Sequence, residues 1–265
     1  MATLNISYLI LDIQSTTPFI QAAQNVNILF AGLSLPSVAG KLLNLIPGVS
    51  NTVQSVTVDT MFVNANNLPA GVPLIAATFA ADNIHLNLNY TNVQLQQSPS
   101  FSGAFTSINM GNLAGGETTL LVNGCQFSQA SSQALISLIS DATVGGKFSI
   151  DMMDSTFTAN SGVLYVRSKV PVDMTIDGCH FEGQTYLVFD LRVLNQFSLM
   201  VSHSNFTNNI VPYAGAAALS MVVHSASIEP QIIFQNNVFM GNQAAMGAVV
   251  YLTGTRPHFT LVDTT

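Results

Sequence analysis

A short apolar pattern recurs along the chain with fixed internal spacing, and it limits the possible folds more than any other feature. Each copy has an apolar residue, a variable residue, a second apolar residue, four varied positions and a large apolar anchor. The anchor is numbered 0, so the two earlier apolar residues stand at −7 and −5. The seven copies start at Val56, Leu86, Leu120, Ile150, Met174, Leu199 and Ile232 and end at the anchors Val63, Val93, Phe127, Phe157, Phe181, Phe206 and Phe239.

The residues before each anchor read as a bent strand. Positions −6 and −4 are mostly polar, so this segment alternates with the period of two that a half-buried strand requires. We expect the strand to bend at −3 and to resume with −2 and 0 facing inward. Position −3 holds residue types that tolerate a bend, namely Gly124, Asp154, Gly178, His203 and Asn236.

An amide follows three residues after most anchors, and a second apolar strand comes after it. Amides stacked about 4.8 Å apart can bond along the stack, and Asn tolerates left-handed turns. The second strands are expected near residues 135–139, 163–167, 187–192, 216–223 and 248–252. The amides are Asn66, Gln96, Asn160, Gln184, Asn209 and Asn242, with Ala130 as the exception.

Two or more strands per repeat, with anchors 24 to 34 residues apart, predict an all-β fold. We expect a right-handed parallel β-helix, a solenoid of about eight or nine coils. A β-sandwich would explain the strands but not the fixed register of anchor and amide. The prediction is one domain over residues 1–265, with a less regular N-terminal coil or cap at 1–50 and regular coils over 51–265.

Both ends of the predicted solenoid need an interpretation. Residues 41–46 lie between Pro36 and Pro47 and suit a short capping helix, or else Ile28 and Leu33 belong to one more coil. Residues 259–265 fit positions −7 to −1, so the last coil is incomplete. We therefore expect the chain to be part of a longer solenoid, or to associate with itself through an open C-terminal strand edge.

Three segments carry a resemblance to a known family: Phe157-Thr-Ala-Asn160, Phe206-Thr-Asn-Asn209 and Phe239-Met-Gly-Asn242. Each resembles the Phe-x-x-Asn half of the repeat in polymorphic outer membrane proteins. The small apolar strands that follow them look like degenerate versions of that family's Gly-Gly-Ala-Ile half. The resemblance covers roughly residues 120–255. It implies a pectin-lyase-like right-handed β-helix on a cell surface, used in adhesion or as a structural element, and it carries no catalytic residues.

Charge excludes several classes of partner. Only 7% of the residues are charged, against roughly 25% in an average soluble domain. The net charge of −7 and the scattered basic residues argue against nucleic acid as a partner.

The longest apolar stretch, residues 26–40, is shorter than the roughly 20 residues of a membrane-spanning helix and contains Pro36. We expect no membrane span, and the first residues lack the pattern of a signal peptide.

The two cysteines, Cys125 and Cys179, both stand at −2, in a predicted column of small residues with Thr91, Ser155, Ser204 and Asn237. Two coils separate them by about 9.6 Å, beyond the reach of a disulfide. We expect two buried thiols that pack as small apolar groups. No metal-ligand spacing is present, and the sequence predicts neither a metal nor a cofactor.

The only weak catalytic candidates are a group of acids on adjacent coils and one histidine near them. They are Asp151, Asp154, Asp177 and His180, with Asp173 nearby. Carbohydrate-active enzymes use clustered carboxylates as acid and base or around Ca²⁺. Solvated surface acids are the simpler interpretation. His203 and His224 are expected to stand apart from this group.

Two further surface features complete the candidates. Arg167 and Arg192 should stack on one outer face beside Asp190, as an ordinary ion-pair cluster or, less simply, as a site for anionic sugars. Sequons begin at Asn5, Asn89 and Asn205, and the register points the last two outward, where a glycan fits.

These observations predict an extracellular or cell-surface structural or adhesive β-helix without catalysis, and a filament subunit is one form that such a protein takes. One alternative is a lyase or hydrolase acting on acidic polysaccharide. The other is a non-catalytic glycan-binding module that uses the outer face of the sheet.

Overall fold

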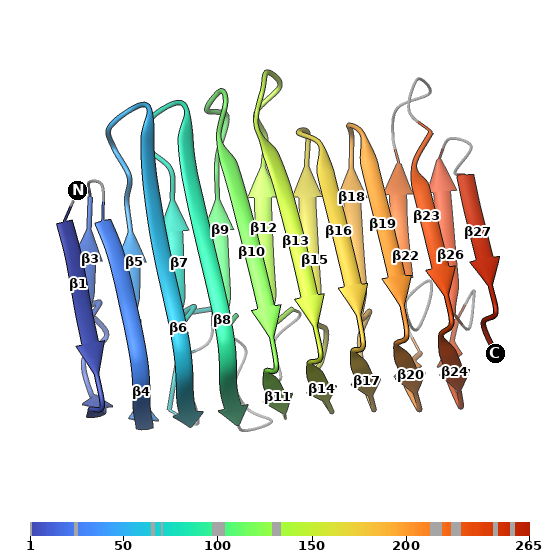
Figure 1. Ribbon diagram of the computed structural model, residues 1–265, viewed down its shortest axis with the longest axis horizontal. Coiled ribbons are helices and arrows are strands. Elements are labelled where there is room, and N and C mark those ends of the chain that lie inside the picture. The colour runs from blue at the N-terminus through green and yellow to red at the C-terminus, as the bar shows by residue number, and fades with distance from the viewer. Residues whose placement is uncertain are drawn as a thin grey trace.

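The computed structural model describes residues 2–23, 26–64, 67–69, 71–96, 104–128, 134–212, 219–223, 229–245, 249–254 and 258–265. These residues form β-strands and no helix. The strands lie side by side along the long axis, with the two termini at opposite ends (Figure 1). The chain runs one way through a front sheet and returns through a second sheet behind it, and each such passage is termed a coil.

The larger sheet has 16 strands and all its pairings are parallel. They are β1 (Ala2–Ser7), β2 (Ile10–Ile13), β4 (Val26–Val38), β6 (Thr52–Asn64), β8 (Ile84–Gln96), β10 (Glu117–Asn123), β11 (Gln126–Ser128), β13 (Lys147–Met153), β14 (Thr156–Thr158), β16 (Val172–Asp177), β17 (His180–Glu182), β19 (Phe197–Ser202), β20 (Asn205–Thr207), β23 (Gln231–Gln235), β24 (Val238–Met240) and β27 (His258–Val262).

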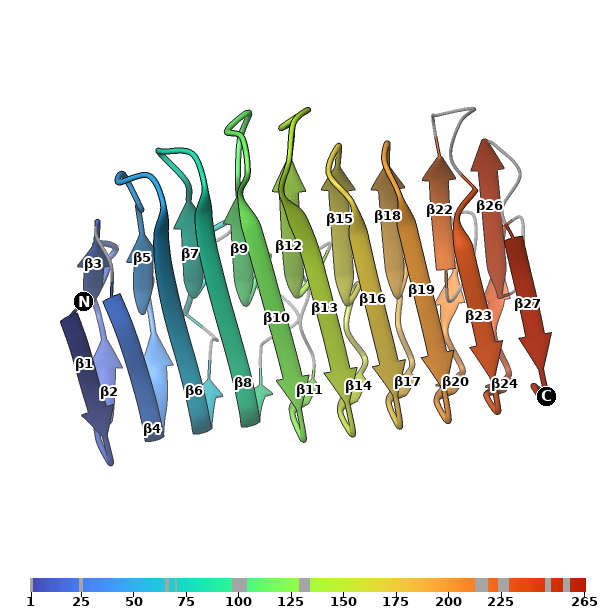
Figure 2. The same cartoon turned by 45° about the horizontal axis from the view of Figure 1, so that its top comes forward.

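The second sheet has nine strands, also parallel, and it lies behind the first along the whole stack (Figure 2). They are β3 (Ile20–Ala22), β5 (Leu43–Leu45), β7 (Ile75–Thr78), β9 (Thr106–Asn109), β12 (Ile136–Ser140), β15 (Leu164–Ser168), β18 (Phe189–Val193), β22 (Leu219–Val223) and β26 (Val250–Gly254). A separate pair joins β21 (Ile210–Val211) to β25 (Gln243–Ala244).

The bend predicted at −3 is confirmed. The long strands β4, β6 and β8 continue through it, whereas from β10 onward each strand is divided there into two. The residue at this position has a left-handed backbone on each described coil. These residues are Tyr8, Gly32, Thr60, Asn92, Gly124, Asp154, Gly178, His203, Asn236 and Asp263.

The anchors face the core, as the pattern predicts, and the five Phe anchors form a continuous ring stack there. Ring centroids lie 5.4 Å apart between Phe127 and Phe157, and 5.0 Å apart between Phe157 and Phe181. Phe206 lies 4.8 Å from both Phe181 and Phe239. Because these spacings match the distance between strands, one apolar cluster runs from coil to coil and links them.

The predicted amide stack is confirmed for four of its members; Gln96 is not one of them, because it pairs with Asn64 and Ser128 one residue after the anchors, and Asn66 lies outside the described residues. Asn160, Gln184, Asn209 and Asn242 each donate from the side chain to the carbonyl of a Phe anchor on the preceding coil, at 2.6 to 3.2 Å. The side-chain oxygen of Asn209 accepts the backbone N–H of Gln184 at 2.9 Å. The amides therefore satisfy the backbone at turns where no strand pairing is available.

The predicted register of one copy is wrong by two residues. Leu88 pairs with Val56 and Leu120, and Leu95, not Val93, pairs with Val63 and Phe127. A shift of two keeps every side chain on its face, so the apolar pattern cannot detect it. The column at −2 consequently contains Val93 in place of Thr91.

The N-terminal coil corrects a second prediction. Residues 43–45 form strand β5, which pairs with β3 and β7, so the capping helix is wrong. The alternative of one more coil is right, although Leu35 and not Leu33 pairs with the anchor Val63. At the other end, Phe259 pairs with Ile232 and Leu261 with Phe234, which confirms the predicted positions.

Candidate functional site

The predicted acidic group lies on the outer face of the larger sheet, but the structure does not gather its four members. Asp151 on β13 pairs with Thr175, whereas Asp177 at the end of β16 pairs with Met153 and Ser202. Asp154 joins Asp177 through its backbone N–H, which donates to the Asp177 carbonyl at 3.0 Å. The His180 ring bonds to Glu182 at 3.3 Å, so the predicted partnership with the aspartates is not formed.

His203 takes the place expected for His180, which corrects the prediction that it stands apart. Its Nδ1 lies 2.8 Å from Oδ1 of Asp177, and the Ser202 hydroxyl donates to the same oxygen at 2.7 Å. Its Nε2 lies 3.2 Å from the side-chain nitrogen of Asn236. Positions −4 and −3 of three successive coils therefore meet at the bend, where Gly178 contributes no side chain. His224 lies outside the described residues.

This Asp–His contact stabilises neighbouring coils rather than activating a nucleophile. Hydrogen bonds from His203 and then from Ser202 hold the pKa of Asp177 below its usual range. The Ser202 hydroxyl donates to the carboxylate and not to the ring, whose other nitrogen faces Asn236. A relay that extracts a proton from a serine needs the hydroxyl on the imidazole. Asp177 and His203 are both about half exposed, so the contact is screened by water.

Other charged side chains also bridge neighbouring coils. Lys147 contacts Asp173 at 2.5 Å, and Arg167 contacts Asp141 at 2.9 Å. These pairs are exposed, and each such pair typically contributes about 0–1 kcal/mol. They are dispersed along the stack and do not converge on one point.

The predicted stacking of the two arginines is confirmed. Arg167 and Arg192 are register partners on β15 and β18. Arg192 bonds to Asp190, whose side chain is only 10% exposed, and its guanidinium lies 5.5 Å from the centre of the Tyr165 ring. The hydrogen bond to Asp190 raises the pKa of Arg192. The guanidinium therefore already interacts with Asp190 and Tyr165 within the protein.

Both cysteines are free and buried, as predicted. Burial raises the pKa of the Cys125 thiol to about 11 and that of Cys179 to about 12, so both are inert thiols at neutral pH. Their backbone N–H groups donate to the hydroxyls of Ser155 and Ser204 on the next coil, each at 3.1 Å. The column at −2 is therefore a hydrogen-bonding column, which the interpretation as small apolar packing missed.

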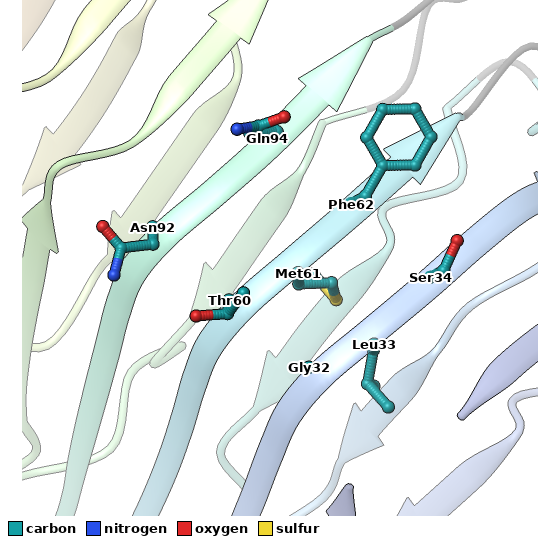
Figure 3. A pocket seen from close by; sticks show the side chains of 8 residues that line it. All are labelled: Gly32, Leu33, Ser34, Thr60, Met61, Phe62, Asn92 and Gln94. Atoms are coloured by element: carbon teal, nitrogen blue, oxygen red, sulfur yellow. The ribbon is translucent and has the colours of Figure 1, made fainter. Parts of the chain in front are cut away.

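A pocket of about 240 Å³ lies where β4, β6 and β8 bend (Figure 3). The pocket was not predicted from the sequence, although Phe62 gave a signal: it is apolar at −1, where most other coils have a polar residue. The pocket has no charged lining residue. It is lined by Gly32, Leu33, Ser34, Thr60, Met61, Phe62, Asn92 and Gln94.

The remaining candidates are placed as follows. Asn5 and Asn205 are exposed, and Asn89 is half-buried within β8. Among the described residues, no three His, Cys, Asp or Glu side chains are grouped to hold a metal ion. In the same part of the chain, no helix is long and apolar enough to cross a membrane.

No model of a known protein family matches the chain. No curated protein matches it either.

Proposed function

We propose that the chain is a right-handed parallel β-helix that acts as a non-catalytic structural or adhesive element outside the cell or at its surface. The observation that carries the proposal is the set of three internal columns, formed by stacked Phe rings, by amides and by the polar side chains at −2. Each column joins successive coils, so the stack resists bending and suits a rigid shaft. Right-handed crossover is supported by the preference of parallel β connections, about 98% of cases.

The distribution of charge supports a role without catalysis. The ion pairs Lys147–Asp173 and Arg167–Asp141 are exposed and tie neighbouring coils together, and the most buried acid, Asp190, is bonded to Arg192. A general acid or base needs a carboxylate or imidazole whose pKa is tuned toward neutrality. Asp177 departs in the opposite direction. The neutral polar surface that remains suits an extracellular protein, as the resemblance to surface repeats implies.

The first experiment is immunogold electron microscopy of the native source, with antibodies raised against the full chain. We expect label on the cell surface or on extracellular rods or filaments. Label confined to the cytoplasm would refute the proposal. Self-association or continuation of the stack through the edge of β27 stays a prediction, and the same images address it.

An enzyme acting on acidic polysaccharide is the competing function, and the contact between Asp177 and His203 is the observation in its favour. The full chain is incubated with polygalacturonate and alginate, and new reducing ends and unsaturated products are measured. We expect no product. Product formation that the Asp177→Asn variant abolishes would overturn the non-catalytic assignment.

N-glycosylation follows from the proposal if the chain enters a eukaryotic secretory pathway. Asn205 is exposed on β20, whereas Asn89 lies in mid-strand between Thr57 and Leu121. We expect Asn5 and Asn205 to be modified more fully than Asn89. Endoglycosidase treatment of the wild type and of Asn205→Gln, followed by intact mass measurement, tests this order.

A further inference from the structure

The pocket at the bend of β4, β6 and β8 is here termed the corner pocket. Ser34, Phe62 and Gln94 are direct register partners on these three strands. Phe62 therefore stands in the middle, with a hydroxyl on one side and an amide on the other, each about 4.8 Å away. Figure 3 shows the Phe62 ring projecting from its strand, with Gln94 on the next strand and Ser34 on the preceding one.

The hollow lies where three adjacent strands bend at the same level. Gly32, Thr60 and Asn92 all have a left-handed backbone, so three adjacent strands turn at the same level. A Cβ on Gly32 would lie 2.8 Å from Cδ1 of Tyr8, so the Tyr8 ring covers this glycine from the preceding coil. Tyr8 is 86% exposed and Phe62 is 41% exposed. Two open aromatic rings thus border the same corner.

The backbone strain at Thr60 indicates that this corner has a function other than stabilising the fold. The φ of Thr60 is 54°, and a β-branched residue in the left-handed region is strained. Tyr8, at the same position on the coil before Gly32, is also left-handed with φ of 54°, and the remaining coils place Gly, Asn, Asp or His there, residue types that enter the region more readily. The hydroxyl of Thr60, bonded to Asp59 at 3.1 Å, is exposed at the rim of the pocket.

We propose that the corner pocket binds one neutral sugar unit of a glycan. The apolar face of Phe62 suits the C–H face of a sugar ring. The side chains of Ser34, Asn92 and Gln94 supply both donors and acceptors for its hydroxyl groups. The volume is below the roughly 300–1,000 Å³ of a drug-sized site, so one ring fits and a longer glycan continues along the open surface.

The lining disfavours other classes of ligand. No Lys, Arg or His lines the pocket, so an anionic sugar or a phosphate finds no cation there. No carboxylate lines it either, so a divalent cation lacks its preferred ligands. The inference deepens the adhesive role proposed above by naming a ligand class. The immunogold experiment tests location and the binding experiment tests the pocket, so the two fail separately.

The test is saturation-transfer difference NMR on the full chain with methyl glycosides of glucose, galactose, mannose and N-acetylglucosamine, followed by titration of the strongest binder. We expect a Kd of about 1 mM, the range of a single small ligand on a shallow site. Phe62→Ala should weaken binding at least about tenfold, and Phe62→Tyr, which keeps the ring, should retain it. The matched control is Val53→Ala, an apolar residue on the same strand that is 45% exposed. It should leave binding unchanged.

Two results would overturn the proposal. One is no saturation transfer to any of the four glycosides. The other is sugar binding that persists undiminished in Phe62→Ala, because the site would then lie elsewhere. The methyl glycoside of galacturonic acid, whose carboxylate is free, serves as the charged comparison, and tighter binding of this acid than of every neutral glycoside would also contradict a pocket without cations. Because Phe62 is partly exposed, circular dichroism should show that both Phe62 variants fold.

Discussion

Removing one buried hydroxyl from the column at −2 should destabilise the stack by a measurable amount. Ser204 is fully buried, its hydroxyl donates to the Ser202 carbonyl at 2.8 Å, and it accepts the backbone N–H of Cys179 at 3.1 Å. Gly178, which has a left-handed backbone, turns the N–H of Cys179 away from the hydrogen bonds between strands. Ser204→Ala therefore leaves this N–H without an acceptor inside the protein.

The expected magnitude follows from the number of bonds lost. An unsatisfied buried donor costs about 1–3 kcal/mol, and the second lost bond adds a smaller amount. We therefore expect Ser204→Ala to lower the free energy of unfolding by about 2–3 kcal/mol. The same geometry recurs at Ser155, whose hydroxyl accepts the Cys125 N–H at 3.1 Å and donates to Met153 at 2.7 Å. Ser155→Ala should have a similar effect.

The assay is urea unfolding followed by far-ultraviolet circular dichroism, together with thermal unfolding. At about 2–4 °C per kcal/mol for a chain of this size, Tm should fall by about 4–12 °C. Ser198→Ala is the matched control, because Ser198 is exposed on the same strand as Ser202 and should change stability by less than about 0.5 kcal/mol.

The double variant tests the reasoning further. Ser155 and Ser204 stand two coils apart, about 9.6 Å, so their effects should add to within about 0.5 kcal/mol. Hydrogen exchange should show loss of protection at the Cys179 amide in Ser204→Ala. If Ser204→Ala matched Ser198→Ala in stability, the column would be a packing feature and its hydrogen bonds would not stabilise the stack.

Three other predictions follow from the columns and the bend. Asn209→Ala removes the acceptor of the Gln184 N–H and a donor to the Phe181 carbonyl, so the free energy of unfolding measured by urea titration should fall by about 2–4 kcal/mol. The control is Asn208→Gly, at an exposed left-handed position, which should be nearly neutral. Ala159 has φ of 54°, so Ala159→Gly should raise Tm slightly and Gly183→Ala, at the equivalent turn, should lower it through about 1 kcal/mol of backbone strain. The pKa of Asp177 is lowered in the folded state, so its contribution to stability is present above the unfolded pKa of about 3.8 and is lost as the pH falls below that value. The stability difference between wild type and Asp177→Asn should therefore shrink between about pH 4 and pH 2. A constant difference would contradict the assigned hydrogen bond.

The sequence alone determined which residues face the core. Apolar residues at −7, −5 and 0 can only be buried together if the strands stack in register, and position −3 must accept a left-handed backbone. The amides three residues after the anchors were predictable for the same reason, since a turn leaves backbone groups that need partners. For Phe157, Phe181 and Asn209, local chemistry therefore sufficed.

The pairing of whole strands was decided only by the tertiary structure. Leu86, Leu88, Val93 and Leu95 are all inward and apolar, so two registers satisfy the pattern equally, and the neighbours Val63 and Phe127 select one of them. The capping helix failed similarly, because β3 and β7 offer residues 43–45 strand partners on both sides.

Contacts between coils were also beyond the sequence, because they depend on which side chains stand at one level of the stack. His203 meets Asp177 across 26 residues, while His180, much nearer in sequence, bonds to Glu182. The corner pocket likewise arises from three segments about 30 residues apart that bend together. A repeat pattern fixes what faces inward on each coil, but the chemistry of an outer face is set by neighbours that only stacking brings together.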